Sequence, residues 1–205
     1  MHVSHLRLTN FRNYRALDAS FPPGLVLLAG ENGQGKTNLL EALFYLSTSK
    51  SPRTSRDAEL VGWHTAPGEA RVARAEGVIQ RSDGEVTLDI IVMAKGDAGR
   101  EPAGGDDEAD VFVAATAGAQ KRIRVNGVPK RAMDLLGNFP VTLFRPEDVD
   151  LITGGPALRR RSLDILLSQL DPRYPRALSR YGRTVTQRNA LLRRIAERTA
   201  TPEQL

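Results

Sequence analysis

Hydrophobic and polar positions along this 205-residue chain first predict a strand, a loop and a helix near its N-terminus. Residues 2–9 alternate in the manner of a strand. The continuous apolar run Leu25–Ala29 has strand length, and such a run is typical of a strand that is covered on both faces. A glycine-rich turn follows over residues 30–35, and residues 37–47 carry the broad apolar face of a helix.

The middle of the chain is predicted to be rich in β-structure. Val86, Leu88, Ile90 and Val92 alternate with Glu85, Thr87 and Asp89, which is the period of a strand. A Ser-Asp-Gly turn before them predicts a hairpin with a strand around residues 72–79. Residues 122–128 predict a second hairpin, with Asn-Gly at its turn. Val111 and Val113 suggest a further strand. The glycine-rich and acidic segment 96–110 is predicted to be a surface loop.

The C-terminal part is predicted to be mainly helical after one short strand. Val141–Phe144 has the apolar character of a buried strand, and Pro156 is suited to the first position of a helix that runs to Leu170. The last predicted helix has the 4-3 spacing of a coiled-coil seam, although an ordinary amphipathic helix fits its short length equally well. The positions of this seam are Tyr174, Leu178, Tyr181, Val185, Arg188, Leu192 and Ile195.

Composition excludes several classes of protein. The chain has no cysteine, which excludes disulfide scaffolds, thiolate metal sites and cysteine nucleophiles. No apolar run is long enough to span a bilayer, and no secretion signal opens the chain, so we expect a cytoplasmic protein without a membrane partner. Residues 1–152 carry a net charge of −2, whereas residues 153–205 carry +7. This asymmetry favours either a polyanionic partner or a solvated arginine-rich helix face.

A phosphate-binding motif lies between the predicted strand and helix. The motif G-x-x-x-x-G-K-T is matched at every fixed position. Its glycines let backbone N–H groups point at phosphate oxygens, Lys36 reaches the β- and γ-phosphates, and the Thr37 hydroxyl ligates Mg²⁺. The alternative is a glycine-rich turn that only caps a helix. The motif comprises Gly30, Glu31, Asn32, Gly33, Gln34, Gly35, Lys36 and Thr37.

Further motifs lie before, within and after the phosphate-binding loop. They are Leu8–Tyr14, Gly30–Ala42, Arg124–Gly127, Phe144–Asp148, Gly154–Pro156, Arg159–Arg161, Leu163–Asp164, Tyr181 and Gln187–Asn189. Together they resemble the RecF family, the bacterial recombination and DNA-repair ATPases related to SMC and ABC ATPases. The resemblance extends the ATP-binding motif to Asn38.

The resemblance implies an α/β fold: an ABC-type P-loop ATPase head with an antiparallel β layer, followed by an α-helical arm that is only partly present. We place the head at residues 1–152 and the start of the arm at residues 153–205. The implied cofactors are ATP and Mg²⁺. The implied partners are duplex and gapped DNA, RecO and RecR in the loading of RecA, and a second copy in an ATP-dependent homodimer of the full-length protein.

The chain departs from the family pattern in two respects. The signature motif, the acidic Walker B strand and the switch histidine belong to a C-terminal half that this chain does not contain. We therefore assign no catalytic residue here, and expect weak ATPase activity only from the full-length protein. Pro52 stands where the family often has an aromatic residue, which affects the expected geometry after the P-loop helix.

The resemblance also assigns roles outside the P-loop. Arg12 and Asn13 are expected near the nucleotide, although Arg12 could equally be a surface-turn arginine. Glu147 is expected at the position of a Q-loop residue that senses Mg²⁺ and water, or else it is a helix N-terminal charge. Arg159, Arg160 and Arg161 are candidates for DNA phosphate contacts. The histidines show no ligand spacing.

Two other functions remain open at the level of sequence. One is an SMC-like structural ATPase that links DNA segments with long coiled-coil arms, which a long heptad region beyond Ile195 would favour. The other is a small-molecule NTP enzyme without a nucleic-acid partner, which salt-dependent DNA binding would exclude.

Overall fold

Six antiparallel strands form one sheet in the computed structural model, which describes residues 1–64, 71–94 and 119–197. The strand order is β2-β1-β3-β4-β5-β6. The predicted loop at 96–110 and the strand suggested by Val111 and Val113 lie outside the described residues. The strands are β1 (His2–Phe11), β2 (Tyr14–Ser20), β3 (Val72–Arg81), β4 (Gly84–Ala94), β5 (Ala119–Val125) and β6 (Val128–Lys130).

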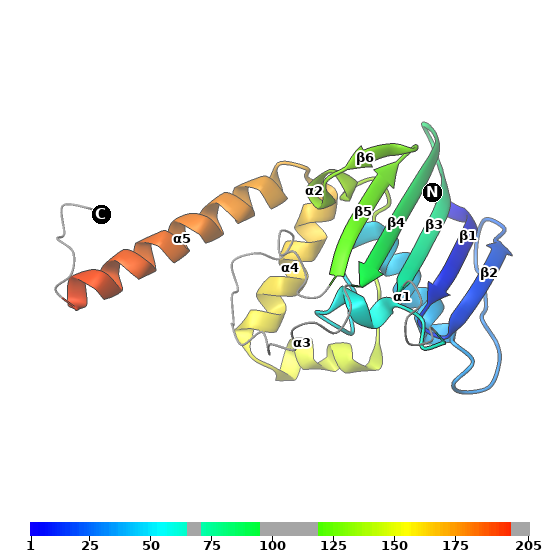
Figure 1. Cartoon of the computed structure of the whole chain (residues 1–205), viewed down its shortest axis with the longest axis horizontal. Helices are drawn as coiled ribbons and strands as arrows, with labels where there is room; N and C mark the ends of the chain where they lie inside the picture. Colours follow the sequence, from blue (N-terminus) through cyan, green and yellow to red (C-terminus); the bar gives the residue numbers. More distant parts are fainter. Residues whose placement is uncertain (65–70, 95–118, 198–205) are drawn as a thin grey trace.

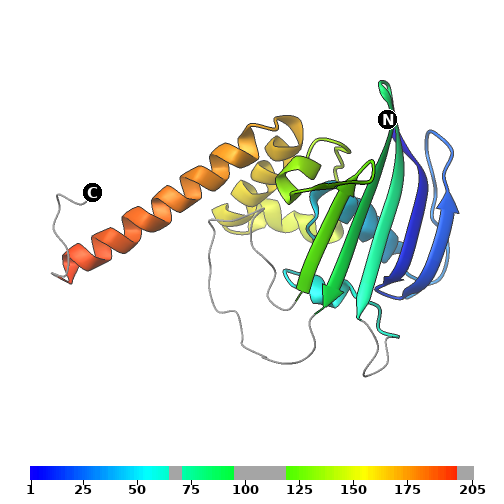
Figure 2. The same cartoon turned by 45° about the horizontal axis from the view of Figure 1, so that its top comes forward.

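Helices cover one face of the sheet and then leave it. Helix α1 lies against the sheet, α4 lies beside it, and α5 projects away as a rod (Figures 1 and 2). Within the described ranges, no helix combines the length and apolarity needed to cross a membrane. The helices are α1 (Lys36–Thr48), η1 (Asp57–Leu60), α2 (Ala132–Leu135), η2 (Pro146–Val149), α3 (Asp150–Thr153), α4 (Pro156–Leu170) and α5 (Tyr174–Ala196).

Both predicted hairpins are confirmed. Strands β3 and β4 pair in register from Val72 to Arg81, and Gly84 closes the first turn. In the second turn, Asn126 and Gly127 both have positive φ, 51° and 76°. A two-residue hairpin turn of type I′ needs positive φ at both central positions, and Asn-Gly is a sequence that readily adopts it.

The core lies between α1 and the face of the sheet that α1 covers. Leu6 and Leu8 of β1 are fully buried, as are Leu88 and Ile90 of β4, which follows from the two-residue period of a strand. Gly77 of β3 permits the close approach of α1, because a Cβ at this position would lie 2.9 Å from a methyl group of Leu46. The alternating pattern in the sequence therefore specified which face of the sheet is buried.

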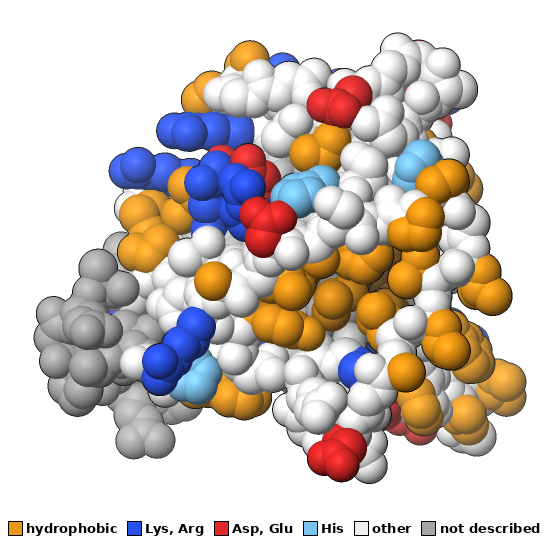
Figure 3. All heavy atoms as spheres, turned by 90° about the vertical axis from the view of Figure 1, so that its right-hand side faces the viewer, with side chains coloured by type: hydrophobic (Ala, Val, Ile, Leu, Met, Phe, Trp, Pro, Cys, Tyr) orange, Lys and Arg blue, Asp and Glu red, His pale blue; other side chains and the backbone are white. Residues whose placement is uncertain are grey.

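The predicted strand over Leu25–Ala29 is wrong. These residues form no strand, and the side chains of Leu25 and Leu27 are 99% and 86% exposed. The physical reason is that no described strand pairs with this run, so its backbone has no ladder and its apolar side chains have no second layer. Viewed from the side of β2, the molecule displays a broad group of hydrophobic side chains (Figure 3).

The predicted strand over Val141–Phe144 is also wrong. Its backbone pairs with a side chain instead, because the Gln169 amide of α4 accepts a hydrogen bond from Val141 N and donates one to Val141 O, at 2.7 and 3.2 Å. The side chain of Phe144 is 85% exposed. Gln169 also accepts a hydrogen bond from Ser47 at 2.8 Å. One amide therefore joins α4, this segment and the end of α1.

A buried polar cluster fixes the end of α1 against the sheet. The ammonium group of Lys121, on β5, donates to the carbonyl of Ser49 and forms an ion pair with Asp57 at 2.7 Å. It also lies over the ring of Tyr45, 5.1 Å from the centroid. Burial lowers the pKa of Lys121, and Asp57 opposes this effect. Burial raises the pKa of Tyr45 well above its usual value, and the charge of Asp57 raises it further.

Tyr45→Phe should weaken the dependence of stability on alkaline pH. The folded state keeps the Tyr45 proton, whereas the unfolded chain loses it above about pH 10, so this contribution to stability is present below that pH and is lost as the pH rises. Urea unfolding at about pH 8 and about pH 11 measures the difference. We expect Tyr45→Phe to lose less stability between these two conditions than the unaltered chain.

Tyr181→Phe is the matched control, because the Tyr181 side chain is exposed. It should leave the pH dependence unchanged. An equal pH dependence in Tyr45→Phe and in the unaltered chain would contradict the proposed effect of burial on Tyr45.

Candidate nucleotide-binding site

The glycine-rich loop curls immediately before α1. Gly30, Gly33 and Gly35 all have positive φ, which L side chains rarely adopt, and α1 then begins at Lys36. The side chain of Gln34 accepts a hydrogen bond from the backbone N–H of Glu31 at 3.2 Å, which closes the loop on itself. This arrangement places the loop at the positive end of a 13-residue helix, the usual setting for a bound phosphate.

Lys36 and Thr37 lie where the loop joins the N-terminus of α1. The Lys36 ammonium lies inside the curl of the loop and donates to the carbonyl oxygens of Gly30 and Glu31, at 2.6 and 2.7 Å. Thr37 is exposed in the first turn of α1, where a hydroxyl can ligate Mg²⁺ bound to phosphate. The curled backbone, the ammonium and the hydroxyl together fit a phosphate chain with its metal ion.

The turn between β1 and β2 packs against the end of the glycine-rich loop and the start of α1. The amide of Asn38, on α1, donates to the Asn13 side chain at 2.7 Å, and the Tyr14 hydroxyl donates to the carbonyl of Gly35 at 3.1 Å. A Cβ on Gly35 would lie only 2.6 Å from the amide nitrogen of Asn13. Asn13 therefore packs directly against the last residue of the loop.

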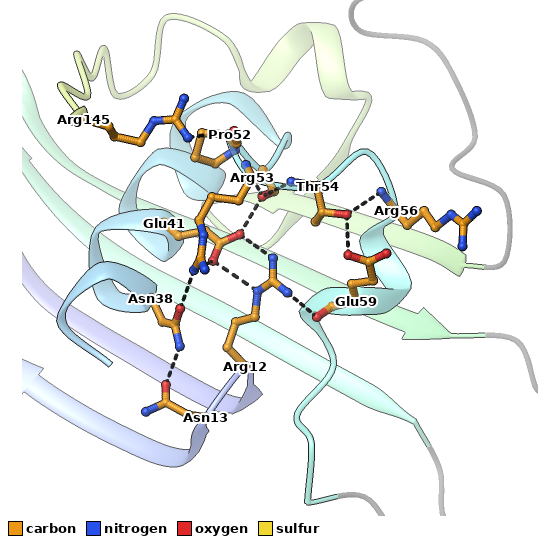
Figure 4. Close-up of polar contacts among 11 residues, drawn as sticks. Arg12, Asn13, Asn38, Glu41, Pro52, Arg53, Thr54, Arg56, Glu59 and Arg145 are labelled. Atoms are coloured by element: carbon orange, nitrogen blue, oxygen red, sulfur yellow. Dashed lines mark hydrogen bonds and ion pairs between the residues drawn. The ribbon is translucent and has the colours of Figure 1, made fainter. Parts of the chain in front are cut away.

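A buried carboxylate on α1 organises the polar contacts beside the loop (Figure 4). Glu41 is 1% exposed. Arg12 donates hydrogen bonds to both carboxylate oxygens of Glu41, from Nε to Oε2 at 3.1 Å and from Nη2 to Oε1 at 2.7 Å. The third Arg12 contact is a hydrogen bond from Nη1 to the carbonyl of Glu59 at 2.8 Å. Because Arg12 is itself buried, this is a desolvated, bidentate ion pair.

The segment after α1 joins the same carboxylate. The Ser51 hydroxyl donates to Glu41, and the backbone N–H groups of Arg53 and Thr54 donate to that hydroxyl at 3.0 and 3.1 Å. The Arg53 guanidinium donates to Asn38 at 2.7 Å and to Glu41 at 3.3 Å. Pro52, which stands at the position that departs from the family pattern, lies between Ser51 and Arg53 in this segment.

Of the three residues predicted near the nucleotide outside the loop, Asn13 packs against Gly35, whereas Arg12 and Glu147 have other surroundings. The guanidinium of Arg12 is committed to Glu41 and Glu59, so the structure gives it a positioning role, and its contact with phosphate stays a prediction. Glu147 is exposed in η2, and its carboxylate forms no hydrogen bond with the part of the chain that is described. Its neighbour Arg145 reaches the site by donating to the carbonyl of Pro52 at 3.1 Å.

The three arginines predicted to contact DNA do not form one surface. Arg159, Arg160 and Arg161 are consecutive on α4, so their side chains fan over about 200° around the helix axis. Arg159 donates to the carbonyl oxygens that end α3, the nearest being Gly154 O at 2.9 Å. Arg161 is exposed. The contact of these arginines with DNA phosphates stays a prediction.

Sequence reasoning missed the residues that support the site. Glu41, Ser51 and Arg53 were not assigned any role. One signal was available, because an acid inside the apolar pattern of a predicted helix must be paired if it is buried. The identity of its partners, which come from the end of β1 and from the segment after α1, depends on tertiary structure.

The fold and the loop geometry define a P-loop nucleotide-binding protein. A family model described as an AAA domain matches residues 5–123, more than half of the chain, and the chain belongs to that family. It is a homologue of RecF that corresponds to the N-terminal half of the curated relatives, and it spans about half of their length.

Curated relatives and solved structures agree on this assignment. The chain is 45% identical over 208 residues to the DNA replication and repair protein RecF of Chloroflexus aggregans, covering 100% of this chain and 50% of the relative. It is 44% identical over 202 residues to that of Herpetosiphon aurantiacus, covering 97% and 49%.

Two solved structures are described as the recombination mediator protein RecF in the RecFOR pathway, one with ATP and one with ATPrS. Each matches with a TM-score of 0.78 at 30% identity, covering 99% of this chain and 48% of the solved chain. The antiparallel sheet followed by helices is thus a RecF-like head fold.

Glu41→Gln should destabilise the fold strongly. It removes the charge that compensates buried Arg12, and breaking one side of a buried ion pair costs about 3–5 kcal/mol. Urea unfolding measures the change in the free energy of unfolding.

Glu59→Gln removes the same charge from an exposed side chain on η1, and it should cost at most about 1 kcal/mol. The importance of the buried pair would be refuted if Glu41→Gln were no more destabilising than Glu59→Gln.

Proposed function

We propose that this chain supplies the nucleotide-binding part of an ATP-binding DNA repair and recombination protein. In this proposal the protein binds duplex DNA next to single-stranded gaps when ATP is bound, and helps to load the RecA recombinase together with RecO and RecR. The observation that carries the proposal is the curled loop with Lys36 inside it, in a chain that is a RecF homologue.

Each site residue has a distinct task in the proposed nucleotide complex. Backbone N–H groups of residues 30–35 and the N-terminus of α1 hold the phosphates, and Lys36 exchanges a carbonyl contact for a phosphate oxygen. The Thr37 hydroxyl ligates Mg²⁺, which supplies charge neutralisation between the β- and γ-phosphates when bound. Asn13 and Asn38, which are hydrogen-bonded to each other, hold the last residue of the loop in place.

In this proposal, self-association couples the binding of ATP to the binding of DNA. Two copies of the full-length protein would close on ATP, and the closed dimer would present its DNA-binding surface. Figure 3 shows a broad apolar surface on the side of β2, and the side chains of Leu25 and Leu27 are exposed. Both observations support the view that further protein structure covers apolar parts of the head. Weak ATPase activity is proposed for the complete protein.

Lys36→Ala should weaken ATP binding roughly 10- to 150-fold, the loss expected for charge-assisted hydrogen bonds to phosphate. Isothermal titration of the complete gene product with ATP and Mg²⁺ measures the affinity. The thermal midpoint should not change, because both Lys36 contacts are to the loop itself. In the Lys36→Ala variant, ATP should also no longer increase the affinity for gapped duplex DNA.

Lys130→Ala is the control, since Lys130 is an exposed lysine on β6. It should retain both the affinity for ATP and the effect of ATP on DNA. Unchanged ATP affinity in Lys36→Ala would overturn the assignment of the nucleotide site.

A further inference from the structure

Helix α5 carries a row of arginines that the motif analysis did not single out. Tyr174–Ala196 contains six arginines and no aspartate or glutamate. At about 100° per residue, four of these arginines fall within an arc of roughly 60° around the helix axis. We define this row as the basic stripe: Arg176, Arg180, Arg183 and Arg194.

Three apolar side chains of α5 lie on the other side of the helix, whereas Leu191 lies about 50° from the centre of the basic stripe. Leu178, Val185 and Leu192 lie roughly 160° from the centre of the basic stripe, by the same helical geometry. Leu178 and Val185 are half-buried, whereas Arg180 and Arg183 are exposed. Any helix that packs on the apolar side would therefore leave the basic stripe in solvent.

The two central arginines of the stripe are available for a partner. Arg176 is partly used, since it pairs with Asp134 at 3.1 Å. Arg180 and Arg183 form no ion pair or hydrogen bond through their guanidinium groups with residues of the described ranges. Because α5 projects away from the sheet and α4, the stripe is also sterically accessible (Figures 1 and 2).

We propose that the basic stripe of α5 binds the phosphate backbone of duplex DNA, an inference that rests on the proposed function and assigns its contact surface. Helix α5 is about 33 Å long, close to one turn of B-DNA. Between Arg180 and Arg194 the helix rises about 21 Å, and each strand of B-DNA carries one phosphate for about every 3.4 Å of the duplex axis.

The chemistry of the stripe favours a duplex over other polyanions. It holds no aromatic side chain, and single-stranded nucleic acid is bound largely by stacking on aromatic side chains. A helix that lies on a membrane likewise carries Lys and Arg on its polar face, but it must insert its apolar face into the headgroup region. Here Leu178 and Val185 on the apolar side are already half-buried by the protein itself, which leaves less apolar surface for lipid.

The test compares two double variants of the complete gene product that lose the same charge. Arg180→Ala with Arg183→Ala removes two proposed phosphate contacts. Arg15→Ala with Arg122→Ala removes two exposed arginines from the sheet. Binding to an unrelated-sequence duplex, with ATP and Mg²⁺, is measured from about 50 to 300 mM salt, and each lost phosphate contact lowers the slope of log K against log salt by about 0.9.

We expect the slope to fall by about 1.8 in the α5 variant and to change little in the sheet variant. Arg180→Lys with Arg183→Lys should retain the slope, because a lysine still neutralises a phosphate. The thermal midpoints of all variants should match that of the unaltered protein, which excludes unfolding as the cause.

The failures of the two proposals are distinguishable. If the unaltered protein binds the duplex but the slope is the same in both alanine variants, the stripe is not the contact surface, and the proposed function stands. If the unaltered protein does not bind duplex DNA at all, both proposals fail. Binding of phosphatidylserine vesicles that is lost in the α5 variant, with DNA binding unaffected, would assign the stripe to lipid and overturn the inference.

Discussion

The ion pair between Glu41 and Arg12 is the interaction on which the geometry of the site depends. A carboxylate that is almost fully buried on the P-loop helix must be compensated, because an unpaired charge in the protein interior is costly. Arg12 meets this requirement with two hydrogen bonds and uses a third to hold the backbone at Glu59. The end of β1, helix α1 and helix η1 are thereby fixed to one another.

This pair also connects the nucleotide loop to more distant segments. Ser51 and Arg53 bring the turn after α1 onto Glu41, and Arg145 reaches that turn through the carbonyl of Pro52. On the other side, Asn38 links Arg53 to Asn13, which lies against Gly35. These contacts form a continuous polar connection between the loop and Arg145, in the segment that precedes α3 and α4.

The sequence predicted local features well and failed where a feature depends on a distant partner. The P-loop motif, the helix after it and the Asn-Gly hairpin were all correct, because their signals are contained in a few consecutive residues. Leu25–Ala29 and Val141–Phe144 have strand composition, but a strand also needs a neighbour to pair with, and none is present among the described strands. The partners of Glu41 likewise come from segments that only the fold brings together.

The most direct test is a double-mutant cycle on Arg12 and Glu41, in which Arg12→Ala, Glu41→Ala and the double variant are compared by urea unfolding. If the pair organises the site, Glu41→Ala leaves the buried charge of Arg12 uncompensated, and Arg12→Ala leaves Glu41 with only the more exposed Arg53 at 3.3 Å. The double variant then costs little more than either single variant. The predicted coupling energy is therefore close to the cost of one single variant, at least about 3 kcal/mol. Costs that simply add, with a coupling energy near zero, would contradict this account.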